Sequence, residues 1–281
     1  MSINCLSTEY SLCQITDLLV LNGTLVECPG LIHGKMGVAV FFFHYARYTG
    51  NELFECYALD LIGKIQNQLH NNSPADYETG LAGIGIGMDY LMTNHFLSID
   101  EDFFEDLDKR MVRAVMYDPW QDFSLYNGLT GYGRYWIMRL QQQTSSVQAR
   151  ECLLHITAHI EKTISEIPAN EQTEVYCFLK DLQKITGFDI CCILFDWLTE
   201  LNQLFPRLEN SFIRNIVRLY QRSHYFEHVS HVEINTALQQ IPDLDMDMPP
   251  VNMGLLTGYA GEGMIRLTTL NQTDMSWMLL L

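Results

Sequence analysis

Three histidines, His224, His228 and His231, lie in the stretch SHYFEHVSH with spacings of four and three residues. On a helix this spacing places all three imidazoles on one face, and three imidazoles can bind zinc. The alternative is a solvent-exposed helix end, at which histidines contact the last carbonyl groups. His155 and His159 repeat the four-residue spacing and favour a surface position. The sequence therefore offers one three-histidine candidate for a metal site.

Titratable residues also stand shortly before glycine-rich segments of the chain. His33 directly precedes the first segment, Asp76 lies four residues before the second, and Asp122 lies six residues before the third. An imidazole and two carboxylates at one opening could act as acid or base, because histidine titrates near neutral pH. The structural alternative is a turn histidine that bonds to the backbone, with aspartates that cap helices or face solvent.

The glycine-rich segments are copies of one motif. Gly-x-x-Gly-x-Gly, with Ala in the last place of the first copy, recurs as GKMGVA, GLAGIG, GLTGYG and GYAGEG. The motif glycines are Gly34, Gly37, Gly80, Gly83, Gly85, Gly128, Gly131, Gly133, Gly258, Gly261 and Gly263. The leading glycines are separated by 46, 48 and 130 residues. Since the last gap is close to three intervals of about 43 residues, roughly two further units without glycines are predicted within it.

Segments with helical periodicity lie between the glycine motifs. Apolar residues recur at helical steps in residues 51–69, 98–119, 151–167 and 211–222, and the opposite face of each segment is polar. The runs after the glycines are apolar nearly all round, which is typical of a helix packed on both sides. No convincing run of alternating strand residues is present. The pattern therefore predicts outer amphipathic helices that alternate with buried inner helices.

This alternation predicts an all-α fold, an α/α toroid of six or seven helical hairpins that forms a single domain over residues 1–281. Six hairpins result if the helix around residues 9–22 pairs with the inner helix after Gly34. An open α-solenoid of the same units is the alternative, and the helix pairing in residues 145–250 stays open. Because glycine destabilises a helix interior by about 1 kcal/mol, its clustering at each inner N-terminus implies a tight turn or a close backbone approach.

Residues beside the leading glycines would line the mouth of such a toroid. Arg134 and Glu262 carry charges on otherwise apolar inner helices, so they would face the lumen or pair with each other. Backbone amides at the inner N-termini could face an anion or a polarised ligand. The predicted cavity-mouth residues are His33, Thr79, Asn127, Arg134, Thr257 and Glu262.

Composition and charge limit the possible classes of protein. A net charge of −17 without a Lys/Arg-rich run argues against nucleic-acid binding. The acidic charge favours solubility in water, and attraction of a basic peptide is the alternative. No apolar run reaches the roughly 20 residues of a membrane span, and no signal-peptide pattern is evident, which favours a cytoplasmic location. Eight cysteines without CxxC spacing, Cys191 and Cys192 among them, are interpreted as free thiols.

The segments GLAGIG, GLTGYG and LLTGYAGEG resemble the repeats of the lanthionine synthetase C-like family, the cyclases of lantibiotic biosynthesis. The resemblance covers residues 1–143 and returns at 250–270. It implies a double-layered α/α barrel with zinc at the mouth of its cavity. The metal would activate a peptide cysteine thiolate, which adds to a dehydroalanine or dehydrobutyrine. A histidine near the mouth would serve the acid-base step.

The zinc ligands that the resemblance implies do not stand at their usual places. The family takes them from a cysteine ahead of one glycine motif and from a Cys-His-Gly triplet in another, both in later repeats. The nearest triplet here is Ile-His-Gly at residues 32–34, in the first repeat. Thr79, Asn127 and Thr257 precede the other leading glycines. The sequence therefore predicts that the usual zinc site is missing.

Three functions remain open from the sequence. The first is a relative that binds a peptide or a partner protein without the usual zinc chemistry. The second is a divergent cyclase that holds a metal through other ligands, such as the three histidines. The third is a glycoside-acting α/α toroid enzyme, which would need two facing carboxylates. No phosphate-binding GxxxxGK[ST], GxSxG or HExxH motif is present, and zinc is the one cofactor that the resemblance implies.

Overall fold

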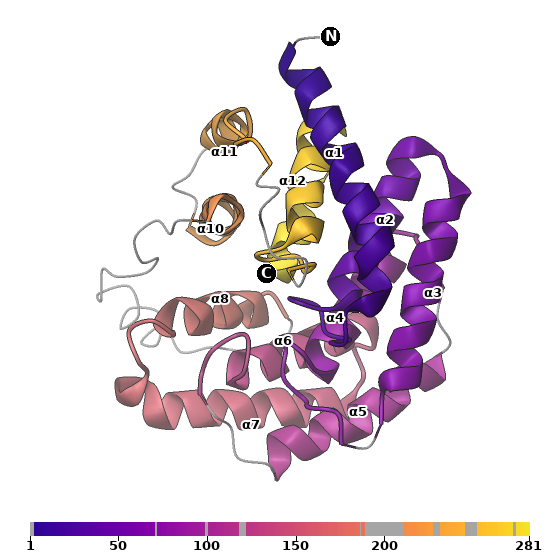
Figure 1. The fold of residues 1–281 in the computed structure, drawn as a ribbon. Helices are drawn as coiled ribbons and strands as arrows, with labels where there is room; N and C mark the ends of the chain where they lie inside the picture. Colours follow the sequence, from indigo (N-terminus) through magenta and orange to yellow (C-terminus); the bar gives the residue numbers. More distant parts are fainter. Residues whose placement is uncertain are drawn as a thin grey trace. The chain divides into compact units, whose positions relative to one another are not determined.

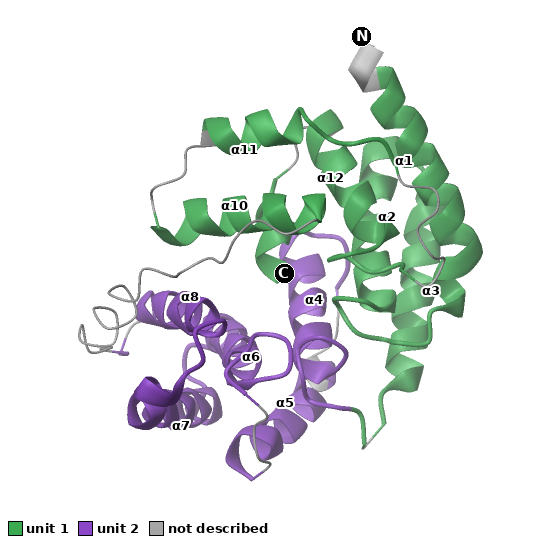
Figure 2. Ribbon diagram, turned by 60° about the vertical axis from the view of Figure 1, so that its left-hand side comes forward, with its two compact units in different colours: residues 1–73, 208–281 green, residues 74–207 purple. Residues whose placement is uncertain are grey.

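The computed structural model describes residues 3–70, 72–98, 101–117, 122–185, 187–188, 211–226, 231–244, 252–271 and 274–281. All regular secondary structure in these ranges is helical (Figure 1), which confirms the all-α fold class. Two compact units divide the chain, Met1–Ser73 with Leu208–Leu281 as unit 1 and Pro74–Arg207 as unit 2 (Figure 2). The single domain over residues 1–281 stays a prediction.

Unit 1 contains the first and the last of the glycine-led helices, α2 and α12, and these pack against each other. Such a contact is expected in a ring of repeats, whereas the first and last repeats of an open solenoid are apart. The α2–α3 connection is tight because Gly50 adopts a φ of 67° and Asn51 caps α3. The helices of unit 1 are α1 (Ile3–Asn22), η1 (Gly23–Leu25), α2 (Lys35–Thr49), α3 (Glu52–Gln68), α10 (Phe212–Phe226), α11 (His231–Leu238), α12 (Tyr259–Asn271) and η3 (Ser276–Leu280).

Unit 2 contains two glycine-led helices and their neighbours. Helix α4 packs against α5 and α6, and α6 packs in turn against α7 and α8. Ser146 caps α7, since its hydroxyl accepts the Ala149 N–H at 3.2 Å. The helices of this unit are α4 (Leu81–Thr93), α5 (Glu101–Met116), α6 (Leu129–Gln142), α7 (Val147–Thr163), η2 (Ile164–Glu166) and α8 (Gln172–Gln183). No helix in the described ranges of the chain is long and apolar enough to cross a membrane.

Inner and outer helices differ in burial as the sequence predicts. Every residue of α2 from Lys35 to Ala46 is buried, and α4 and α6 are buried over most of their length. The outer helices α3 and α7 bury a single stripe each, such as Ala58, Leu61 and Ile65 on α3. The alternation of outer and inner helices is therefore confirmed for these repeats.

The N-terminal helix departs from the simplest pairing. The count of six hairpins would pair this helix with the inner helix after Gly34, but α1 packs chiefly on α12, the last inner helix. Thr16 of α1 also reaches Tyr45 of α2 through a side-chain hydrogen bond. Helix α1 thus occupies the outer position beside the α12–α2 contact.

The leading glycines exclude a side chain because the preceding loop folds back onto them. Gly34, Gly80 and Gly128 all have extended backbones, with φ between −111° and −118°, so their dihedral angles alone would admit other residues. A Cβ at any leading glycine would collide with the main chain six residues earlier. The residue after each glycine donates its N–H to the carbonyl seven positions back: Lys35 to Cys28 (2.9 Å), Leu81 to Pro74 (2.9 Å), Leu129 to Asp122 (3.0 Å) and Tyr259 to Asn252 (2.9 Å). The predicted close backbone approach is confirmed.

The third motif position has a different use. A Cβ there would strike an aromatic ring that belongs to the following inner helix. The pairs are Gly85 of α4 with Tyr135 of α6, Gly133 of α6 with Phe178 of α8, and Gly263 of α12 with Phe41 of α2. Each glycine therefore makes a recess for the neighbouring helix, and the direction is the same every time.

The contact between a third-position glycine and an aromatic ring also identifies one of the predicted repeats without glycines, the one that contains α8. Tyr135 and Phe41 each lie seven residues after the leading glycine of their own helix. On α8, Phe178 fills the recess at Gly133 in the same way. The residue seven positions before Phe178 is Glu171, the N-cap residue of α8, so Glu171 stands where a leading glycine would be. Glu171 follows Gly128 by 43 residues, which is the interval predicted for the missing repeats.

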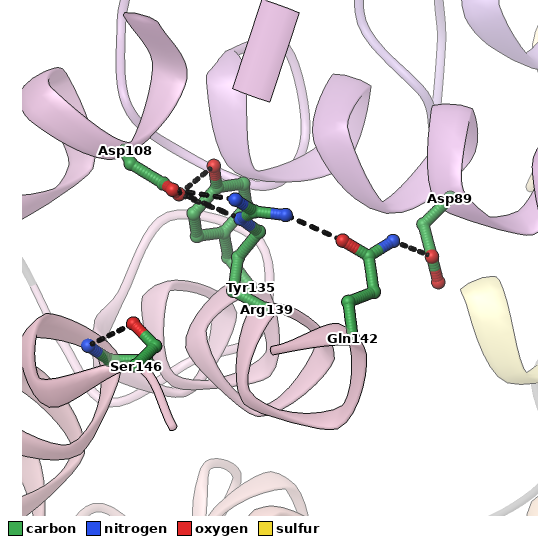
Figure 3. Close-up of polar contacts among 7 residues, drawn as sticks. Asp89, Asp108, Tyr135, Arg139, Gln142 and Ser146 are labelled. Atoms are coloured by element: carbon green, nitrogen blue, oxygen red, sulfur yellow. Dashed lines mark hydrogen bonds and ion pairs between the residues drawn. The ribbon is translucent and has the colours of Figure 1, made fainter. Parts of the chain in front are cut away.

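A partly buried polar network joins α4, α5 and α6 (Figure 3). Asp108 of α5 accepts hydrogen bonds from the Tyr135 hydroxyl at 2.7 Å and from Nε and Nη2 of Arg139 at 2.9 and 2.8 Å. Arg139 also donates to Gln142 at 2.5 Å, and the Gln142 amide donates to Asp89 of α4. Burial raises the pKa of Asp89 and, together with the Asp108 charge, raises the pKa of Tyr135 well above 10. The network fixes the ring that fills the Gly85 recess.

Alanine substitutions at two glycines should have opposite effects on stability. A Cβ at Gly85 would lie 2.6 Å from the ring of Tyr135, which Asp108 holds in place. We expect Gly85→Ala to lower the free energy of unfolding by about 1–3 kcal/mol through overpacking. A Cβ at Gly63, inside α3, meets nothing within 4 Å, so Gly63→Ala should raise it by about 0.5–1 kcal/mol. Urea unfolding followed by circular dichroism measures both, and effects of the same sign would contradict the assignment.

Replacement of Arg139 by lysine should destabilise the chain although it keeps the charge. The guanidinium binds both oxygens of Asp108 and lies 4.7 Å above the Phe104 ring, a geometry that an ammonium does not reproduce. We expect a loss of about 1–3 kcal/mol, measured by thermal unfolding. The control is Lys109→Gln, whose exposed pair with Asp106 should contribute less than about 0.5 kcal/mol. Equal losses in the two variants would contradict this role of the network.

Candidate functional site

The loops that start α4 and α6 are joined through the backbone. The N–H groups of Tyr77 and Glu78 both donate to the Tyr126 carbonyl, at 2.9 and 3.1 Å. Above this contact the exposed Asn127 amide donates to the Glu78 carboxylate at 3.4 Å. The predicted cavity-mouth positions Thr79 and Asn127 therefore belong to one surface. We call this surface the unit 2 rim, which comprises residues 76–79, residues 122–127, Glu171 and Glu174.

The two predicted acid-base aspartates of this rim bond to their own loops. Asp76 accepts the Thr79 N–H at 2.6 Å and the Thr79 hydroxyl at 3.1 Å. Asp122 accepts the Ser124 N–H at 2.9 Å and the Ser124 hydroxyl at 2.5 Å. Both carboxylates thus stabilise the turns before the inner helices, as the structural alternative for them describes.

Glu174, a residue that the sequence analysis does not single out, closes the seam between α6 and α8. At the α4–α6 and α12–α2 seams, the N–H three residues before the leading glycine donates to a loop carbonyl, that of Tyr126 or of Ile32. At the α6–α8 seam the corresponding N–H, that of Leu125, donates to the Glu174 carboxylate at 2.6 Å. A side chain therefore takes the place of the main-chain acceptor in the repeat without glycines.

Glu171 supports the same loop. Its carboxylate accepts the Phe123 N–H at 2.8 Å, two residues before the bond that Glu174 makes. Sequence reasoning missed both glutamates because neither forms part of a motif. The interval of 43 residues from Gly128 to Glu171 is the signal that could have found them.

Burial and nearby charges set the protonation of this seam. Burial raises the pKa of Glu174 to about 7, the Glu171 and Asp122 carboxylates act in the same direction, and the Leu125 N–H and Arg134 oppose the shift. Arg134, on the inner helix α6, forms a side-chain hydrogen bond with the buried Tyr77. This cation is therefore placed beneath the rim, close enough to Glu174 to interact with it.

The predicted residues of unit 1 lie at the start of α2 and α12. His33 follows Ile32, whose carbonyl accepts the Leu255 N–H at 2.9 Å, and Thr257 lies two residues beyond Leu255. The backbone of the two loops is in such close contact that a Cβ at Gly254 would lie 2.5 Å from the His33 Cα. Both loops therefore form a second seam of the same kind.

Glu262 has a partner on its own helix. It forms an ion pair with the buried Arg266 one turn further along α12. Arg266 also donates to the Pro242 carbonyl at 3.1 Å. The charge on this inner helix is thus balanced within unit 1.

The described residues do not provide the zinc ligands that the sequence resemblance implies. No three His, Cys, Asp or Glu side chains in the described ranges are grouped so that they could hold a metal. Thr79 donates its hydroxyl to Asp76, and Asn127 donates its amide to Glu78, so these positions hold loops together. We therefore derive no reaction step through zinc.

The structure describes only some of the other residues that the sequence offers as metal ligands. His224 lies on α10, but His228 and the side chain of His231 lie outside the described residues, as do Cys191 and Cys192. On α7, His159 stacks on Phe123 with a ring separation of 5.8 Å. Burial lowers the pKa of His159, and His155 and Lys162 add to the effect.

Glu174→Gln should remove a pH dependence of stability. The pKa of Glu174 is raised to about 7 in the folded chain. Its contribution to the free energy of unfolding is therefore fully present below the unfolded-state pKa of about 4.5 and is lost as the pH rises through 7. Glutamine keeps an oxygen acceptor for the Leu125 N–H and carries no charge. We expect the variant to be more stable than the wild type by about 1–2 kcal/mol at pH 8 and nearly equal at pH 4.5. Urea unfolding at both pH values measures this, and a constant difference would contradict it.

Comparison with known proteins accords with the repeat geometry. The family model of the lanthionine synthetase C-like protein matches residues 26–179, more than half of the chain, whereas no curated protein matches it. The matched region begins before α2 and extends through most of α8, so it includes the repeat whose leading glycine is replaced by Glu171. The chain belongs to the lanthionine synthetase C-like family.

Proposed function

We propose that this protein binds a peptide at the unit 2 rim and does not close thioether rings by the family's zinc chemistry. Membership of a family that acts on peptides supports a peptide as the ligand. The donor set of the rim supports the second part, because its side chains offer hydroxyl, amide and carboxylate groups and include no cysteine or histidine.

The observation that carries the proposal is the pairing of Glu78 and Asn127 on two joined loops. Backbone hydrogen bonds hold the loops together, so the two side chains are pre-positioned rather than ordered by the ligand. The Asn127 amide can donate to and accept from a peptide backbone, and Glu78 can accept from a backbone N–H or a cationic side chain. Their mutual bond is long at 3.4 Å and exposed, so a ligand can replace it at low cost.

The charge of the rim favours a peptide with basic residues. Asp76, Glu78, Asp122 and Glu171 contribute carboxylates, and Arg134 lies beneath them. The chain as a whole has a net charge of −17, which would accelerate the approach of a cationic peptide at low ionic strength.

Binding and ring closure should separate in a test with one synthetic peptide. The probe is a linear peptide with one cysteine, one dehydroalanine and two lysines. We expect calorimetry to show binding with or without one equivalent of zinc, while mass spectrometry after thiol alkylation shows ring closure at the rate of the peptide alone. The double variant Glu78→Ala/Asn127→Ala should weaken binding about thirtyfold, since each of the two lost hydrogen bonds contributes about 1 kcal/mol.

The matched control is Gln143→Ala, an exposed amide at the opposite end of α6 from Asn127. This change should leave the dissociation constant unaltered. Ring closure that zinc accelerates in the presence of the protein would show a cyclase and overturn the proposal. Absence of binding, or equal weakening by Gln143→Ala, would overturn the assignment of the rim.

A further inference from the structure

Helix α1 is apolar on two opposite sides. One side is buried within unit 1 and includes Leu12, Ile15 and Leu19. The other side is open to solvent and consists largely of apolar residues. We call it the α1 stripe: Leu6 (56% exposed), Tyr10 (67%), Val20 (39%) and Leu21 (70%), extended by Leu25 of η1 (72%). A helix that is apolar all round is normally buried on both sides. The rest of unit 1 buries only one side of α1.

The outer helices α3 and α7 do not share this feature. The exposed residues of α3 include Glu52, Glu55 and Asp60, which is typical of a solvated surface. On α1, the exposed apolar side chains form two groups, Leu6 with Tyr10 and Val20 with Leu21, and Cys13 and the charged Asp17 are exposed between them. Exposed apolar surface of this kind on a folded protein marks a site of interaction.

The charge around the α1 stripe selects the kind of partner. The first 34 residues contain no lysine or arginine, and Glu9, Asp17 and Glu27 are their only charged side chains apart from histidine. A second copy of this chain would bring the same carboxylates opposite one another, at a net charge of −17 for each copy. A partner with basic residues beside its apolar face would instead form complementary pairs.

We propose that the α1 stripe is a docking surface for an amphipathic helix of a partner protein or peptide, with an apolar stripe flanked by lysine or arginine. The span from Leu6 to Leu21 is 15 residues, or about 22 Å along the helix axis, so a partner helix of four turns matches it. Apolar side chains packed along this length would provide the affinity, and the flanking charges the orientation. This surface lies in unit 1 and does not depend on the function proposed for the unit 2 rim.

The test uses the whole chain and an 18-residue peptide of leucine and lysine, with leucines spaced three and four apart to form one stripe. A scrambled peptide of the same composition, without a stripe, is the reference. By fluorescence anisotropy we expect the striped peptide to bind at least tenfold more tightly than the scrambled one. The double variant Tyr10→Ser/Leu21→Ser should remove this preference.

Two further variants keep the test independent of folding defects. Leu53→Ser/Leu154→Ser removes two exposed apolar side chains from α3 and α7 and should bind as the wild type does. Asp17→Lys leaves the apolar stripe intact and should weaken the striped peptide several-fold, with a smaller effect at high salt. Circular dichroism confirms that each variant is folded.

Several outcomes would overturn the proposal. These are equal binding of the striped and scrambled peptides, an unchanged preference in Tyr10→Ser/Leu21→Ser, or equal losses in the Leu53→Ser/Leu154→Ser control. Sedimentation velocity supplies another: self-association of the wild type that the Tyr10→Ser/Leu21→Ser variant abolishes would show that a second copy covers the stripe. The peptide test at the unit 2 rim is unaffected by any of these results.

Discussion

The absence of a side chain at four leading glycines is the constraint on which the other features depend. Each loop folds back until its main chain occupies the space of a Cβ, and a carbonyl seven residues back then accepts the first N–H of the inner helix. The first N–H of each inner helix, which would otherwise lack a partner within the helix, is thereby satisfied by backbone alone. The side chains of the preceding loops are therefore not needed to cap the helices and can bond between loops. This bonding forms the unit 2 rim.

Recognition between neighbouring inner helices follows from the same motif. A glycine five residues after the leading one receives an aromatic ring, and the loop three residues before the leading glycine bonds to the next loop. One contact excludes side-chain volume and the other pairs backbone groups, so both would be lost if the helices shifted by one residue. Together they determine the order of inner helices within each unit, including the packing of α12 on α2.

The parts of the fold that depend on local patterns could be predicted from the sequence. Glycine turns and helical periodicity are local, and the inner and outer helices follow from them. The position of α1 could not, since apolar residues on two sides of a helix do not say which side is covered by α12. The glutamates at the α6–α8 seam were missed because a carboxylate that replaces a carbonyl leaves no motif. Asp76 and Asp122 make the hydrogen bonds of turn residues, and their acid-base role stays a prediction.

The substitution of Glu174 for a main-chain acceptor also bears on how such repeats diverge. A backbone carbonyl is present whatever the residue, whereas a carboxylate can be gained or lost by a single codon change. At the α6–α8 seam the Glu174 carboxylate accepts the Leu125 N–H, and Glu171 stands in the place of a leading glycine. The number of glycine motifs in this chain is therefore a lower limit on its number of inner helices, since α8 receives the Gly133 contact through Phe178 although Glu171 stands at its leading position.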